Sequence, residues 1–467
     1  MLSFSQSVRL VLLGLLLGNA SFSPVQAQIK REAGNRPNVV LIVADDLGYG
    51  DLGCYGQAKI KTPVLDRLAK EGTRFTQFYA GSSLGNASRA SLLTGRHTGH
   101  TNIRGISRLA TALFSSDVTI AEMLQENGYQ TGAFGKWAVG DNGSSGTPNK
   151  QGFKEWVGLL NGSLAQMYYP PAFSRNESIW LISENQGGRK GLYMPDMLTS
   201  NALSFIKLTK PVPTNQSRRF FLYHATQLPH ANADLGRATG NGMEIPSDAP
   251  YTDERWPQTE KNRAAMITKL DTDVGKLLDQ LKRHKVETNT VVIFTSDNGP
   301  WRAGGSDPGF FNAAGGLRGQ RGELYEGGLR VPLIVWWPGQ VASSNVVNTP
   351  CAMWDILPTI GELTGTGATD KIDGRSLVGA LKGKSLAPPD YLYWELHNDG
   401  FTQALRQGDW KAVRPHGKPM ELYNLAQDPQ EKKNVAAQHP DEVKKISALM
   451  AAARTDSDQW PVPEAVK

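Results

Sequence analysis

Acidic and amide side chains follow two apolar runs in this sequence. The run from Asn38 to Asp46, NVVLIVADD, ends in Asp45 and Asp46, and a second run, TVVIFTS, is followed by Asp297 and Asn298. Three carboxylates and an amide supply oxygen ligands, which suit a hard cation such as Ca²⁺ or Mg²⁺. Clustered carboxylates also repel one another strongly unless a cation lies between them. The spacing alone is a weak metal signal, because a solvated turn after each strand explains it about as well.

The elements that must position these groups are predicted to be strands of a buried sheet. A continuous apolar run is typical of a parallel strand covered on both faces, and acids at its carboxyl end lie where open α/β sheets bind ligands. Further strands are predicted at Arg74 to Tyr79, Thr131 to Gly135, Arg219 to Tyr223, Thr290 to Ser296 and Val331 to Trp337. Helices are predicted from the N-cap Thr62 to Lys70, and at Thr119 to Glu126, Asn262 to Lys285 and Trp354 to Leu363.

The pattern changes in two other parts of the chain. From Gly140 to about Gly188 the chain is rich in Gly, Ser, Asn and Pro, which predicts an irregular insertion that shapes a pocket. The aromatic residues of this insertion either stack on sugar rings or only anchor the loop: Trp156, Tyr168, Tyr169 and Trp180. After about Lys371, short strands predict a small antiparallel sheet, followed by a helix: Tyr391 to Leu396, Gln403 to Gln407, Asp409 to Arg414, Glu421 to Asn424 and the helix Asp441 to Arg454.

The N-terminus has the pattern of a secretory signal. The apolar core from Leu10 to Leu17 is too short to span a bilayer, and the string Val25 to Ala27 offers small residues at the positions that a signal peptidase requires for cleavage after Ala27. The alternative is a buried N-terminal helix. We therefore expect a signal peptide at residues 1–27, a large domain at 28–370 and a small C-terminal α+β subdomain at 371–467, in a secreted or periplasmic protein without a transmembrane anchor. The two cysteines, Cys54 and Cys351, leave open whether they pair.

The formal charge of +6 is spread along the chain without long runs of like charge, so we do not expect nucleic-acid binding. A diffuse positive balance either attracts anionic substrates or serves only solubility. The oligomeric state is not readable from the sequence.

One segment specifies the chemistry more closely. Residues 78–104 read FYAGSSLGNASRASLLTGRHTGHTNIR, which resembles the signature of the type I sulfatases, C-x-P-S-R-x-x-L-L-T-G-R. Aligned on Arg89 and on the run Leu92 to Arg96, the signature places Gly85 where the family has its cysteine or serine. Ala87 stands where the family has proline.

Other strings match the same family in the same order. Asp45, Asp46, Gly48 and Asp51 fit D-D-x-G-x-x-D, and Ser296 to Gly299 fit S-D-N-G; the remaining matches are Gly135 to Trp137, Pro229 with His230, Leu317 to Pro332, Gly408 to Lys411 and Glu421 to Leu425. The chain is similar to bacterial arylsulfatase-like enzymes from Pro37 to about Asn434. The resemblance implies an alkaline-phosphatase-like α/β fold, in which helices sandwich a large mixed, mostly parallel sheet.

The resemblance also implies roles for individual residues. The metal, usually calcium with magnesium possible, would be held by Asp45, Asp46, Asp297 and Asn298. Arg89 would orient the residue at position 85, Lys136 and His230 would contact the sulfate group, and Arg321 stands where the family usually has a second lysine. The expected ligand is a sulfated small molecule or a sulfated carbohydrate.

Family chemistry uses a formylglycine, which is made from the signature cysteine and attacks sulfur as a hydrate. Glycine at position 85 cannot be oxidised to formylglycine, so none is expected. The first hypothesis is a sulfatase that binds its ligand but is inactive or crippled. The alternative is an active sulfuric or phosphoric ester hydrolase that uses a metal-activated water or another nucleophile such as Ser82 or Ser83. A sequence error at position 85 and a purely structural cation site also remain open.

Overall fold

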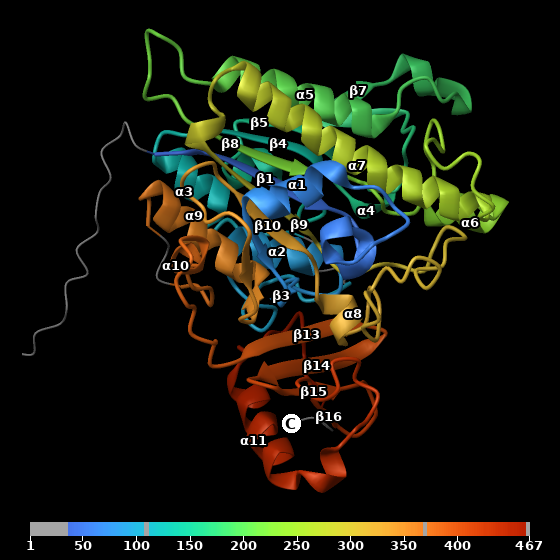
Figure 1. Ribbon diagram of the computed structural model, residues 1–467, viewed down its shortest axis with the longest axis vertical. Helices are drawn as coiled ribbons and strands as arrows, with labels where there is room; N and C mark the ends of the chain where they lie inside the picture. Colours follow the sequence, from blue (N-terminus) through green and yellow to red (C-terminus); the bar gives the residue numbers. More distant parts are fainter. Residues whose placement is uncertain (1–35, 107–111, 368–370, 464–467) are drawn as a thin grey trace, which may run out of the picture.

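The structure is a computed structural model that describes residues 36–106, 112–367 and 371–463. The predicted signal peptide lies outside the described residues. A ten-stranded sheet forms the centre of the large part of the molecule (Figure 1). In spatial order its strands are β11 (Asn345–Val347), β2 (Thr73–Phe75), β10 (Leu333–Trp336), β9 (Thr290–Ser296), β1 (Asn38–Ala44), β8 (Phe220–Ala225), β4 (Gln130–Lys136), β5 (Glu155–Leu159), β6 (Ala172–Arg175) and β7 (Ser178–Leu181).

The middle of this sheet is parallel. β1 pairs in parallel with β9 and β8, and β4 pairs in parallel with β8 and β5. Antiparallel pairs attach β10 to β9 and β2, and β6 to β5 and β7. The expected mixed, mostly parallel sheet is therefore confirmed. All seven residues of β1 and all seven of β9 are buried, as the continuous apolar runs predict.

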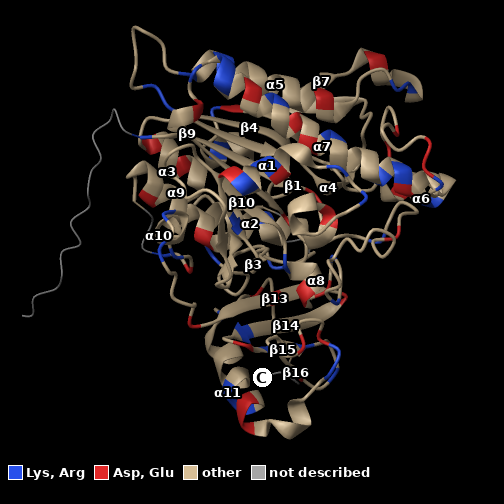
Figure 2. Cartoon of the chain, in the orientation of Figure 1, with Lys and Arg blue, Asp and Glu red and all other residues tan. Residues whose placement is uncertain are grey.

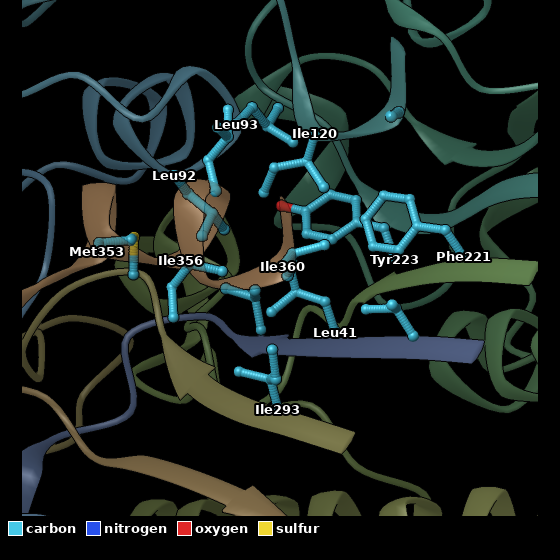
Figure 3. Close-up of a cluster of buried hydrophobic side chains, with 14 of the residues drawn as sticks. Leu41, Leu92, Leu93, Ile120, Phe221, Tyr223, Ile293, Met353, Ile356 and Ile360 are labelled. Atoms are coloured by element: carbon cyan, nitrogen blue, oxygen red, sulfur yellow. The ribbon is translucent and has the colours of Figure 1, made fainter. Parts of the chain in front are cut away.

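Helices cover both faces of the sheet. One face carries α1 (Pro63–Glu71), α5 (Met194–Thr209) and α7 (Gln258–Arg283), and the other carries α2 (Gly85–Thr94), α3 (Ile120–Glu126), α9 (Ile356–Thr364) and α10 (Val378–Leu381). Figure 3 shows the second layer, where Leu92 and Leu93 of α2 point with Ile356 and Ile360 of α9 toward Leu41 of β1. Burying each such side chain contributes about 1.5–3 kcal/mol, which fixes α2 on the sheet.

The C-terminal part is a four-stranded antiparallel sheet with a helix, as predicted. Its order is β13 (Leu392–Asn398), β14 (Gly400–Gln407), β15 (Trp410–Arg414) and β16 (Glu421–Asn424). Ile446 and Met450 of α11 (Pro440–Ala452) pack on one face of it, and Trp394 on the other face packs with Tyr79 and Trp354 of the large part. Figure 1 shows this sheet and α11 in orange and red at one end of the molecule.

Two sequence predictions fail locally. The insertion at Gly140 to Gly188 is not irregular throughout, because it contains β5, β6 and β7, which extend the main sheet. The strand predicted at Arg74 to Tyr79 is two strands, β2 and β3 (Phe78–Tyr79); β3 pairs with β12 (Cys351–Ala352). The remaining short helices are α4 (Gly162–Ala165), α6 (Ala233–Thr239) and α8 (Glu326–Leu329).

Three further features bear on the sequence analysis. Cys54 and Cys351 are both free thiols. Among the described residues, no helix has the length and apolarity that crossing a membrane requires. Basic and acidic residues are interspersed along α7 and over the small sheet (Figure 2), which matches the diffuse charge of the sequence.

Candidate functional site

The register of two neighbouring strands brings the predicted metal ligands together. Ala44 at the end of β1 pairs with Ser296 at the end of β9, so the next residues, Asp45 and Asp297, leave the sheet side by side. Asp46 then takes a left-handed backbone with φ 62°, and its amide donates to Asp297 Oδ1 at 3.2 Å. Asn298 Nδ2 donates to Asp46 Oδ1 at 2.7 Å. The four predicted ligands therefore form one buried cluster.

Lys136 reaches this cluster from the end of β4. Its Nζ lies 2.6 Å from Asp45 Oδ2, and the side chain is buried. The preceding residue, Gly135, has φ 131° and lies so close to β8 that a Cβ would stand 1.8 Å from the carbonyl oxygen of Ala225. Only glycine fits this approach, which explains the glycine before Lys136.

Arg89 reaches the cluster from α2. The helix begins at Gly85 and ends at Thr94, and the next residue, Gly95, caps it in a left-handed conformation with φ 70°. Arg89 is fully buried and donates to Asp297 Oδ2 from Nε at 3.1 Å and from Nη2 at 2.9 Å. Its Nη1 donates to the hydroxyl of Tyr223 at 3.3 Å. The guanidinium fork thus fixes Asp297 in one orientation.

Gly85 faces the same carboxylate. A Cβ at this position would lie 2.7 Å from Asp297 Oδ2 and 3.5 Å from Asn298 Oδ1. The first residue of α2 therefore points directly at the predicted metal ligands. Ser82 and Ser83, the alternative nucleophiles, are both buried. Among the described residues, neither lines the cavity of about 440 Å³ that lies beside Gly85.

Arg321 and His230 close the other side of the cluster. Arg321 Nη1 lies 2.9 Å from Asp46 Oδ2 and donates to His230 Nε2 at 2.9 Å. The guanidinium stacks over Trp301, 4.2 Å from the ring centroid. His230 therefore accepts at Nε2, and burial lowers its pKa below the usual value despite the attraction of Asp45.

Three cationic side chains face the three carboxylates of the cluster, and Arg89 lies 4.0 Å from Asp45 as well as beside Asp297. Lys136 pairs with Asp45, Arg89 with Asp297 and Arg321 with Asp46, so the formal charges cancel. Burial by itself raises the pKa of Asp45, but Lys136 and His230 hold it below its ordinary value. Burial and the neighbouring Asp45 together raise the pKa of Asp297.

The cluster fits a divalent cation. Among the described residues, Asp45 Oδ1 and Asn298 Oδ1 are buried without a hydrogen-bond partner, and a buried oxygen in that state is costly. Oxygen atoms of Asp45 and Asp46 and a ring nitrogen of His230 lie within 4.8 Å of one another. Two unsatisfied oxygens within a group of carboxylates are what a hard cation would satisfy.

A cavity of about 440 Å³ opens beside the cluster. Gly85, Lys136 and Arg321 all line it, so the three reach a common space. Its other lining residues include Asn86, Ala138, Asp141 and Asn161. An anionic ligand in this cavity would meet Lys136 and Arg321 at its inner end.

Comparison with known proteins identifies the family. The sequence profile described as "Sulfatase" matches residues 37–366. The chain belongs to the sulfatase family. A second profile, "N-sulphoglucosamine sulphohydrolase, C-terminal", matches residues 320–456, which include the small sheet of this sulfatase.

Individual relatives extend over most of the sulfatase. It is 30% identical to the N-acetylgalactosamine-6-O-sulfatase of Bacteroides thetaiotaomicron, over 95% of this chain and 99% of the relative. It is 32% identical to human arylsulfatase A, over 85% and 83% of the two chains. Among solved structures, Ps i-CgsB in complex with k-i-k-neocarrahexaose superposes with a TM-score of 0.75 at 28% identity, covering 89% of this chain and 92% of that one.

Some residues of the sulfatase site escaped the sequence analysis. Tyr223 lies within the apolar strand β8, and no sequence pattern indicates that its hydroxyl accepts a hydrogen bond from Arg89. Trp301 lies two residues after the S-D-N-G string, which was the only hint of its contact with Arg321. Of the two roles considered for the aromatics of the insertion, anchoring fits Trp156 and Tyr168, because both are buried in the core; Trp180 is exposed.

Proposed function

We propose that this sulfatase is an exported protein that binds a divalent cation and a sulfate ester, and that it does not hydrolyse the ester by the formylglycine route. The observation that carries the proposal is Gly85. It stands at the start of α2 against Asp297, at the position that the signature gives to the nucleophile, and it has no side chain to oxidise or to attack with.

The ligand would be held by groups that the chain retains. Asp45, Asp46, Asp297 and Asn298 would hold calcium, with magnesium as the alternative. When bound, the cation would supply positive charge beside the sulfuryl oxygens. Lys136 and Arg321 are bonded to carboxylates that a cation would neutralise, so both side chains are then free to contact the anionic oxygens from the wall of the cavity.

A sulfated carbohydrate is the ligand class that the relatives favour. One relative is named for the 6-O-sulfate of N-acetylgalactosamine, and a solved neighbour holds a carrahexaose. Secretion or residence in a periplasm, after cleavage near Ala27, would place the protein where such polymers occur. The division into a large domain at residues 28–370 and a subdomain at 371–467 is part of the same proposal.

Calorimetric titration with N-acetylgalactosamine 6-sulfate tests the proposal. We expect binding in calcium that is lost in chelator, with the ester recovered intact after incubation. Asp297→Ala should abolish the calcium dependence, and Lys190→Ala is the control, because Lys190 is exposed and pairs with Glu244 instead of a carboxylate of the cluster. Release of sulfate at the rate of an ordinary sulfatase would contradict the proposal, and so would binding indifferent to calcium.

A second candidate is a hydrolase in which a water attacks in place of a side chain. His230 favours it, because its Nε2 lies in the cluster, 3.6 Å from Asp46 Oδ2, and burial holds its pKa below the usual value. The neutral ring can accept a proton at Nε2 when Arg321 turns from it toward a ligand. This candidate requires that sulfate or phosphate release from an aryl ester be abolished in both Asp297→Ala and His230→Gln. Activity that survives either change rejects it.

A further inference from the structure

A second cavity adjoins the first and has no part in holding the sulfate group. It measures about 300 Å³ and shares Asp141, Leu160 and Asn161 with the 440 Å³ cavity beside Gly85. The two cavities therefore lie side by side, with these residues between them. A ligand whose sulfate lies against Lys136 and Arg321 can extend past Asn161 into this second space.

The floor of the second cavity is the open face of the sheet's outer strands. Gly158 of β5 pairs with Ser174 of β6, and Ser174 pairs with Ile179 of β7, so these residues share one face. Trp156 and Leu160, two residues to either side of Gly158, pack in the core on the α2 side of the sheet. Farther out on the same face, Ile179 and Leu181 are 65% and 76% exposed, so the sheet surface there is open to solvent.

The lining of this cavity combines two kinds of surface. Small residues, Gly158, Ala172 and Ser174, keep the floor flat, and Ile179 and Leu164 add aliphatic contacts. Asp141, Asn142 and Asn161 supply hydrogen-bonding groups around it. A sugar ring has this same division, with C–H groups on its faces and hydroxyls at its edge. An alkyl tail would use the floor but not the polar groups.

We propose that the second cavity binds the sugar ring next to the sulfated one, so that the protein recognises a sulfated oligosaccharide in preference to a sulfated monosaccharide. This inference rests on the proposed function, because the sulfate must be anchored beside Lys136 and Arg321. The outer strands β5–β7 would then be the surface by which the protein distinguishes a sulfated oligosaccharide from a sulfated monosaccharide.

Paired calorimetric titrations test this inference. The probes are N-acetylgalactosamine 6-sulfate and a tetrasaccharide that carries the same sulfated residue, both in calcium. We expect the tetrasaccharide to bind the wild-type protein at least tenfold more tightly. In Ser174→Trp the indole covers the floor, so the tetrasaccharide should lose this advantage while the affinity for the monosaccharide stays the same.

Two matched variants separate a loss of binding in the second cavity from general damage to the fold. Ile179→Ser removes an exposed aliphatic contact on the floor and should lower only the affinity for the tetrasaccharide, by threefold or more. Leu208→Ser removes a side chain of similar exposure, 66%, on α5, which does not line the cavity, and should change neither affinity.

The possible outcomes are distinct. Equal affinity of the wild-type protein for both probes, or an equal loss for both in Ser174→Trp, overturns the inference and leaves the proposed function standing. If neither probe binds, the proposed function fails, and the inference fails with it. If dodecyl sulfate outbinds ethyl sulfate and Ser174→Trp removes that gain while the tetrasaccharide gains nothing, the occupant is an apolar tail, and the sugar is rejected.

Discussion

Gly85 and Asp297 lie against each other, so closely that a Cβ at residue 85 would stand 2.7 Å from Asp297 Oδ2. The same oxygen accepts both hydrogen bonds from Arg89. Any larger residue at position 85 therefore requires Asp297 to turn away from that position, and turning it strains the bonds to Arg89. Residue 85, Asp297 and Arg89 form one coupled unit at the start of α2.

This coupling predicts the effect of one methyl group. Glycine to alanine within a helix is ordinarily stabilising by about 0.5–1 kcal/mol. Gly85→Ala should instead destabilise the calcium-free protein by about 1–3 kcal/mol, because the methyl group overpacks the site. Urea unfolding in chelator measures the difference. Gly379→Ala is the control, since nothing lies within 4 Å of its Cβ position, and equal stability of the two variants would contradict the close contact.

Lys136 is predicted to compete with the cation. Lys136→Met leaves Asp45 buried without its nearest cationic partner, with Arg89 4.0 Å away, which should cost about 3–5 kcal/mol in chelator. Calcium should then stabilise the variant more than it stabilises the wild-type protein, because the cation takes over the compensation of Asp45. Unfolding curves with and without calcium report both effects. Lys190→Met, at an exposed ion pair, should show neither effect, and a smaller calcium response in Lys136→Met would refute the competition.

A second buried ion cluster is predicted to join the two sheets. Lys411 of β15 is fully buried and lies 3.0 Å from Glu326 and 2.9 Å from Glu431. Lys411→Met should lower the free energy of unfolding by about 3–5 kcal/mol, because Glu431 loses its cationic partner in a dry environment and Glu326 is left with its pair with Arg330. The same change at Lys445, whose pair with Glu442 is exposed, should cost less than about 1 kcal/mol. Similar losses at both positions would show that burial does not govern the effect.

Two buried histidines should make the fold sensitive to acid. Burial lowers the pKa of His97 to about 4 despite the attraction of Asp373, and burial lowers that of His224 to about 4 as well. Unfolded histidine titrates near 6.5, so the native state binds fewer protons between these values. Stability is therefore complete above pH 6.5 and is lost as the pH falls toward 4, by up to about 3 kcal/mol for each group.

His97→Asn tests this pH dependence. The asparagine oxygen can replace Nδ1 of His97 as the acceptor for the amide of Gly99. Denaturant unfolding at a series of pH values should show a shallower decline between pH 6.5 and 4 in the variant. An unchanged slope would mean that His97 is not the group that resists protonation.

Much of this architecture follows from local sequence pattern. The runs NVVLIVA and TVVIFTS became β1 and β9. Apolar residues at helical spacing in the predicted long helix are buried on the α1–α5–α7 side: Met266, Leu270, Val274, Leu277, Leu278 and Leu281. The four proposed metal ligands meet because parallel strands end at one edge. The small C-terminal sheet was also predicted strand by strand, since tight turns separate its short runs.

Other parts of the structure have no such pattern. α5 was not predicted, because polar residues separate its apolar positions, although Pro195 stands in its first turn, where proline is favoured. β5 was hidden by the glycines around it, and its place in the sheet depends on parallel pairing with β4, which is a long-range contact. The pairing of Lys136 with Asp45 and of Arg89 with Asp297 depends on tertiary geometry that spacing cannot supply.

The most direct test of the account is hydrolysis of an aryl sulfate by the wild-type protein and by Gly85→Cys, each produced with a formylglycine-generating enzyme and assayed in calcium. A Gly85→Cys/Ala87→Pro variant restores both signature positions, and mass spectrometry of the peptide that contains residue 85 reports the conversion. Loss of a catalytic nucleophile costs on the order of 10⁶ in rate. We therefore predict no formylglycine-like turnover by the wild-type protein and clear turnover by the converted variant. Wild-type turnover comparable to that of the converted variant would contradict the central claim.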